Sequence, residues 1–81
     1  MAQSGSSDLL TAFGKAVRAR REQLGLSQEA LGFEAELDRT YISGIERGVR
    51  NPTLETMIRI AAALESPVSR LLVAAERIAD A

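Results

Sequence analysis

The sequence predicts an all-α domain of five helices, and three observations lead to this fold class. Apolar residues recur at spacings of three and four, which places them on one face of a helix. No stretch alternates apolar and polar residues with the period of two that a half-buried strand needs, and β-branched residues do not cluster. Residues that cap helices stand between the periodic segments. The 81 residues correspond to one domain.

The first helix is expected from Asp8 to Leu24, with apolar residues at helical spacing. An aspartate favours a helix N-terminus, and Gly25 suits the position just after a helix. The preceding residues are small and polar, so we expect a flexible tail at 1–7 that is not a signal peptide. The domain itself is then expected at 8–81.

Two short helices follow, each preceded by a capping residue. The second is expected over Gln28–Ala35 with Ser27 as N-cap, and the third over Arg39–Arg47 with Asp38 as N-cap. Gly48 is expected to end the third helix.

The fourth helix is expected over Leu54–Leu64, capped by Thr53. The fifth is expected to have Ser66 as N-cap and Pro67 in its first turn, where a missing N–H costs nothing, and to reach Arg77 or beyond. The buried stripe predicted for the fourth helix is Leu54, Met57, Ile58, Ala61 and Leu64.

Composition excludes several classes of function. The chain has no cysteine and no histidine, so disulfides, zinc fingers and thiolate or imidazole catalysis are excluded, and a cytoplasmic location is expected. No apolar run is long enough to span a bilayer. We therefore expect no enzyme activity, no metal, no cofactor, no small-molecule ligand and no membrane association.

The pair of short helices within residues 28–47 has the pattern of a helix-turn-helix. Its second helix carries Arg39, Thr40 and Ser43 on the side opposite its apolar residues. Such a motif presents the start of its second helix to the major groove of DNA, where an arginine can grip guanine and a threonine can touch a thymine methyl. The apolar seam predicted between the two helices is Leu31, Ala35, Leu37, Ile42 and Ile45.

Several residues around these helices suit contacts with DNA, and some of them suit a second role as well. Gln28 and the helix N-terminus behind it suit a phosphate, and Arg47 and Arg50 suit the flanking DNA backbone, but Gln28 and Arg50 also suit an ordinary surface. Tyr41 suits either a packed position or a phosphate contact. Gly44 is expected to leave room for DNA.

Net charge is −1, whereas nucleic-acid binders are usually basic. Basic residues cluster, however, so we expect a dipolar molecule with one basic face, and the alternative is that these charges only solvate helix surfaces. The cluster near the end of the first helix is Lys15, Arg18, Arg20 and Arg21.

Two strings, FGKAVRARREQLGLSQEAL and RTYISGIERGVRNPTLETMIRIAAAL, resemble the Cro/phage-repressor-type (XRE) family of helix-turn-helix regulators. The resemblance extends from about Phe13 to Leu72 and implies a five-helix lambda-repressor-like domain. Within the family, the start of the second string resembles the controller proteins of restriction–modification systems, which are small dimeric regulators. The resemblance implies DNA contacts from Gln28, Arg39, Thr40 and Ser43. It also implies a structural ion pair of Arg21 with Glu46, although spacing alone predicts that both are exposed.

Two glutamates depart from the family pattern. Glu36 stands where the family usually has a glycine between the motif helices, and Glu65 replaces a glycine after the fourth helix. Because a non-glycine residue in a left-handed conformation costs roughly 1–2 kcal/mol, either the first turn is strained or its geometry differs.

The resemblance also implies two-fold dimers on half-sites about 34 Å apart. The fifth helix has a broad apolar stripe, so we expect it to be a C-terminal dimerisation helix, although Leu71 and Leu72 also suit closure of the monomer core. The predicted interface is Ile60, Leu71, Leu72, Ala75 and Ile78.

The leading hypothesis is a homodimeric, sequence-specific transcription regulator that binds a double-stranded DNA operator with two half-sites and controls restriction–modification genes. The alternative is an antitoxin or another protein-binding module on the same fold.

Overall fold

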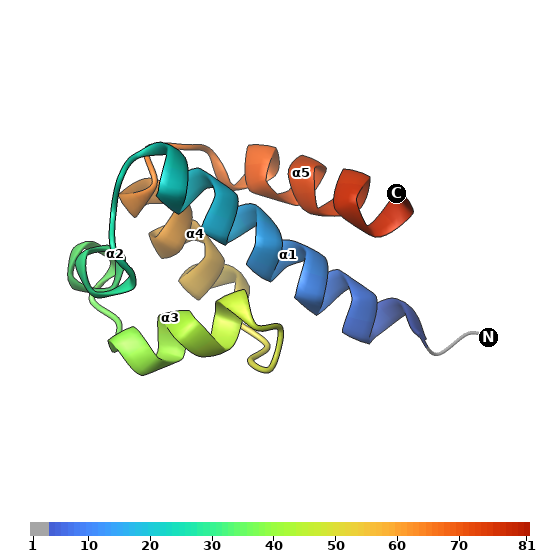
Figure 1. The fold of residues 1–81 in the computed structure, drawn as a ribbon, viewed down its shortest axis with the longest axis horizontal. Helices are drawn as coiled ribbons and strands as arrows, with labels where there is room; N and C mark the ends of the chain where they lie inside the picture. Colours follow the sequence, from blue (N-terminus) through green and yellow to red (C-terminus); the bar gives the residue numbers. More distant parts are fainter. Residues whose placement is uncertain (1–3) are drawn as a thin grey trace.

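The computed structural model describes residues 4–81, and these confirm the all-α fold of five helices (Figure 1). α1 and α5 lie side by side and run in opposite directions, while α3 also packs against α1, and α2 packs against both α3 and α4. Within the described residues there is no strand, and no helix is long and apolar enough to cross a membrane. The helices are α1 (Ser4–Gln23), α2 (Gln28–Ala35), α3 (Arg39–Glu46), α4 (Leu54–Ala63) and α5 (Val68–Asp80).

α1 begins at Ser4, four residues before the predicted start at Asp8. Residues 4–7 are therefore helical, and the rest of the predicted tail, residues 1–3, lies outside the described residues. The small, polar residues of this segment gave no apolar pattern from which a helix could be predicted. A helix that is already nucleated can nevertheless extend through them, because it gains one hydrogen bond for each residue it adds.

The core is built from apolar side chains of all five helices. Its largest fully buried side chains include Val17 of α1, Leu31 of α2 and Ile42 of α3. All thirteen buried apolar residues belong to one cluster, so the described residues pack around a single core. The other buried members are Ala12, Phe13, Ala16, Ala35, Ile45, Ile60, Ala61, Leu64, Leu71 and Ala75.

α4 presents a different face to the core from the one predicted. Ile60, which was assigned to the dimer interface, is 0% exposed, whereas Leu54 and Ile58 of the predicted stripe are 60% and 49% exposed. Residues 54, 57, 58 and 61 and residues 57, 60, 61 and 64 have the same helical spacing, so periodicity fits two overlapping stripes. Packing against α2 and α5 selects the second.

α5 also uses part of its apolar stripe to close the monomer. Leu71 and Ala75 are only 3% and 4% exposed, so both pack into the monomer core, and they leave little surface for the dimer interface to which they were assigned. Leu72 is 37% exposed, and Ile78 is half-buried. At the start of the helix Pro67, not Ser66, is the N-cap, because its backbone is extended (φ −68°, ψ 147°) and not yet helical.

Several helix ends use a left-handed backbone. Gly25 and Gly48 adopt it with φ of 72° and 77°, as expected for glycines that end helices. Glu36 and Glu65 adopt it too, with φ of 62° and 56°. Of the two alternatives for the turn between α2 and α3, the structure shows the strained one, because Glu36 keeps the left-handed backbone with a side chain that disfavours it.

Candidate nucleic-acid interface

The turn between α2 and α3 is tight because glycine stands where it passes α2. A Cβ atom on Gly32 would lie 2.6 Å from the carbonyl oxygen of Leu37, far inside van der Waals contact. The backbone amide of Leu37 donates to the Gly32 carbonyl at 2.8 Å. These contacts fix the start of α3 relative to α2.

A second glycine lets α1 approach the end of α3. A Cβ atom on Gly14 would collide with the backbone carbonyl oxygens of Ile45 and Glu46. Sequence reasoning missed this residue. The available signal was a glycine inside an apolar helical segment, which costs helix stability and usually has a packing reason.

α3 has one buried and one outward side, as the motif predicts. Ile42 and Ile45 are 0% and 1% exposed, while Arg39 and Thr40 are exposed and Ser43 is half-buried. We call Arg39, Thr40 and Ser43 the recognition face. Arg39 and Thr40 are the first two residues of α3, at the end that enters the major groove in helix-turn-helix proteins, and Ser43 lies about one turn further along.

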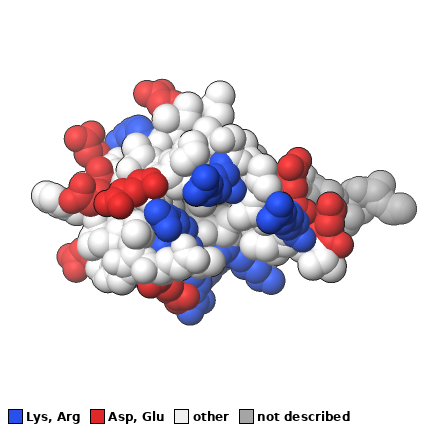
Figure 2. Space-filling view, turned by 90° about the horizontal axis from the view of Figure 1, so that it is seen from above, with Lys and Arg blue, Asp and Glu red and all other residues white. Residues whose placement is uncertain are grey.

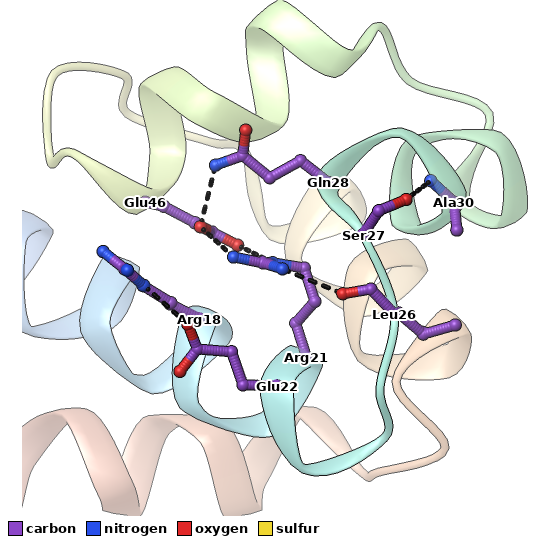
Figure 3. Close-up of polar contacts among 8 residues, drawn as sticks. All are labelled: Arg18, Arg21, Glu22, Leu26, Ser27, Gln28, Ala30 and Glu46. Carbon is purple, nitrogen blue, oxygen red and sulfur yellow. Dashed lines mark hydrogen bonds and ion pairs between the residues drawn. The ribbon is translucent and has the colours of Figure 1, made fainter.

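The C-terminal end of α3 is held by an ion pair (Figure 3). Arg21 donates from Nε to Glu46 Oε2 at 2.6 Å and from Nη2 to Oε1 at 3.0 Å. The side chains are 11% and 4% exposed, so the exposure that spacing predicts is wrong and the pair implied by the resemblance is present. The hydrogen bond to Glu46 raises the pKa of Arg21 above its ordinary value.

Gln28 belongs to this buried cluster. Its side-chain Nε2 donates to Glu46 Oε1 at 3.0 Å, and Figure 3 shows its amide oxygen turned away from Glu46. Arg21 also donates from Nη1 to the carbonyl of Leu26 at 2.8 Å, just before α2. The amide expected to meet a phosphate therefore fixes α2 to the end of α3.

Gly44 has a different role from the one predicted, and this role involves Arg50. Gly44 is buried, and a Cβ atom there would lie 2.6 Å from Arg50 Cγ, so Gly44 makes room for Arg50 and not for DNA. The Arg50 guanidinium lies 5.5 Å from the centre of the half-buried Tyr41 ring, within cation–π range. Arg47 is exposed and its Nε lies 3.4 Å from Ser43 Oγ, beside the recognition face.

Charge is less separated than the sequence suggests. Figure 2 views the molecule from the side opposite α3, and lysine and arginine are present there among the carboxylates. Two arginines of the predicted basic cluster on α1 are engaged in contacts within the protein. Arg21 binds Glu46, and Arg20 donates to the carbonyl of Leu64 at 3.0 Å. Basic side chains are thus not confined to one face.

Two short helices crossed at a tight turn, with an apolar inner side and a polar outer side on the second, define a helix-turn-helix protein. A helix-turn-helix family model matches residues 17–71, more than half of the chain, and the chain belongs to this family.

Within this family, the chain is similar to several control and controller proteins. The chain is 51% identical over 53 residues to control protein C.BamHI of Bacillus amyloliquefaciens, a match that covers 64% of this chain and 65% of that protein. The restriction-modification controller protein C.AhdI of Aeromonas hydrophila has a similar structure, with a TM-score of 0.75, 44% identity and coverage of 76% of this chain and 94% of that chain.

The controller protein C.Esp1396I, solved as a tetramer in complex with its natural 35 base-pair operator, is also similar. Its TM-score is 0.82 at 33% identity, and the match covers 90% of this chain and 96% of that chain.

Proposed function

We propose that this chain is a sequence-specific regulator of transcription that binds double-stranded operator DNA as a homodimer and controls restriction–modification genes. The observation that carries the proposal is that Arg39 and Thr40 of the recognition face are exposed at the start of a helix whose other end is fixed by the Arg21–Glu46 pair. The controller proteins among its relatives support the same assignment. The activity is binding in the cytoplasm, and it uses no catalytic group, cofactor or small-molecule ligand.

Two residues of the recognition face contact bases in this proposal, and three residues outside it support them. Arg39 makes two hydrogen bonds to a guanine edge, and Thr40 contacts a thymine methyl or a base edge. Arg47 and Arg50 contact phosphates of the flanking DNA backbone, which orients the protein without reading sequence. Gln28 acts indirectly, because its amide nitrogen holds Glu46.

The homodimer surface in the proposal is an apolar groove of about 300 Å³ between α1, α4 and α5. Leu9 and Phe13 of α1, Met57 of α4 and Leu72 of α5 are among its lining residues. Leu54 and Ile58 of α4 leave further apolar surface exposed. Apolar surface gathered in this way marks an interface. Leu72 and Ala75 are the members of the predicted set that line the groove, and Leu72 is the exposed one.

The dimer is tested with neighbouring residues of α5. Leu72→Glu is expected to give monomers in analytical ultracentrifugation and to weaken operator binding, because it places a charge in the groove. Val73→Glu is the control, since Val73 is 45% exposed and lines a different surface with Pro67 and Arg70. A dimer unaffected by Leu72→Glu contradicts this interface.

The DNA-binding proposal is tested by selecting duplexes from a random pool and measuring their affinity by fluorescence anisotropy. Wild-type protein is expected to enrich a two-fold symmetric site, and Arg39→Ala is expected to lose the enrichment. Arg70→Ala removes an exposed arginine outside the motif and is expected to retain it. Equal binding of wild type and Arg39→Ala to every duplex would contradict the proposal.

A further inference from the structure

The turn that leads into α3 contains a left-handed glutamate. Glu36 has φ 62° and ψ 43°, a conformation that glycine adopts freely and that a Cβ atom disfavours. Its backbone amide donates to the Phe33 carbonyl at 3.2 Å, as in an ordinary helix end. An additional contact is therefore needed to favour this conformation over the alternatives open to a glutamate.

Arg59 of α4 supplies that contact. Its Nη2 donates to the carbonyl of Ala35 at 2.8 Å and to the carbonyl of Glu36 at 3.0 Å. The same nitrogen lies 3.7 Å from Glu36 Oε1. One guanidinium thus holds the last carbonyl of α2, the carbonyl of the left-handed residue and its carboxylate, and hydrogen bonds from a charged donor are stronger than neutral ones.

The position of α3 depends on this turn. Only Leu37 and Asp38 separate Glu36 from Arg39 at the start of the helix. The Leu37 amide also donates to the Gly32 carbonyl at 2.8 Å, so the turn is tied closely to α2. We propose that Arg59 is a positioning residue for DNA recognition. It keeps Glu36 left-handed and so fixes where Arg39 and Thr40 are presented. The inference rests on the proposed function.

The chain contains a matched contact away from α3. Glu65 is left-handed with φ 56°, and Arg20 of α1 donates to the carbonyls of Leu64 and Glu65 at 3.0 and 3.4 Å. This contact holds the junction of α4 and α5. It therefore serves as an internal control for the effect of losing such an arginine on stability alone.

The experiment is a double-mutant cycle on Arg59 and Glu36, with operator affinity measured by anisotropy well below the unfolding midpoint. Arg59→Ala is expected to weaken binding about tenfold, since a misplaced recognition face loses about one good base contact. Glu36→Gly is expected to bind at least as well as wild type. In the Glu36→Gly background, Arg59→Ala is expected to cost less than about twofold, because glycine needs no support. Arg59→Lys, which keeps one charged donor, is expected to recover part of the affinity.

Arg20→Ala is expected to lower the unfolding midpoint about as much as Arg59→Ala while leaving operator affinity within about twofold. Equal losses from Arg59→Ala in both backgrounds, or an equal loss from Arg20→Ala, overturn the inference. If wild-type protein binds no duplex, the proposed function fails, and NMR then decides the inference separately. The amide resonances of Leu37, Asp38 and Arg39 must shift in Arg59→Ala, and must shift less when Glu36→Gly is also present.

Discussion

The two ends of α3 carry charged residues in opposite environments. At its start Arg39 is exposed, and at its end the Glu46 side chain is 4% exposed and accepts hydrogen bonds from Arg21 and Gln28. The buried end draws its partners from α1 and α2, so it holds the helix in the globule. The exposed end keeps its guanidinium available. A recognition helix is therefore fixed at one end so that it can present the other.

The largest loss of stability is expected from breaking the ion pair at the buried end of α3. Glu46→Ala leaves the Arg21 guanidinium largely buried without its carboxylate, which is expected to lower the free energy of unfolding by about 3–5 kcal/mol. Urea denaturation followed by circular dichroism measures the change.

A second ion pair provides the control. Arg18 and Glu22 pair at 3.0 Å on α1 with side chains 64% and 54% exposed. Arg18→Ala is expected to change stability by no more than about 0.5 kcal/mol, because exposed pairs of this spacing contribute little. Similar losses from Glu46→Ala and Arg18→Ala contradict the distinction between the two pairs.

At the exposed end, Arg39→Ala is expected to change recognition and not stability. Loss of a bidentate contact to guanine removes roughly 1–3 kcal/mol of discrimination at one base pair. Competition binding with operators substituted at each position measures this loss, which should be confined to a single position in each half-site. A loss spread evenly over all positions indicates that Arg39 contacts phosphate instead.

Arg47 lies next to the recognition face and tests the other kind of contact. It is exposed at the C-cap of α3. Arg47→Ala is expected to weaken binding to all duplexes to a similar extent and to reduce the slope of log affinity against log salt by about 1 per subunit, as expected for the loss of one phosphate contact. Titrations at several salt concentrations measure the slope, and an unchanged slope contradicts the assignment.

Sequence alone predicts those features of the fold that depend on residues close together along the chain. The existence of all five helices, the buried Ile42 and Ile45, and the exposed Arg39 follow from helical spacing and caps. The burial of Ile60 does not, because two overlapping stripes on α4 have the same period and packing selects between them.

Contacts between distant parts of the chain were likewise beyond local reasoning. Gln28 is tied to Glu46, 18 residues away, and Arg59 reaches the carbonyl of Ala35, 24 residues away. Neither arrangement leaves a periodic signal in the sequence. The Arg21–Glu46 pair was expected only through the family resemblance, since spacing placed both residues at the surface.

The smallest effect concerns the caps that precede the two motif helices. Ser27 Oγ accepts a hydrogen bond from the Ala30 amide at 3.0 Å, so Ser27→Ala is expected to cost about 1 kcal/mol of stability. In the described part of the chain, Asp38 occupies the N-cap of α3 without a side-chain hydrogen bond to the first turn. Asp38→Ala therefore removes only the interaction of its charge with the helix dipole, about 0.3 kcal/mol in moderate salt.

The same Asp38 carboxylate adjoins Arg39 at the end of α3 that faces DNA in the proposed function, and it opposes the approach of phosphates. Asp38→Ala is thus expected to strengthen DNA binding slightly, about twofold, while Ser27→Ala leaves affinity unchanged once the protein is folded. Thermal unfolding and anisotropy on the two variants separate these effects. A stability loss from Asp38→Ala as large as that from Ser27→Ala shows instead that the aspartate caps α3 in solution, and the exposed end is then more firmly fixed than its contacts indicate.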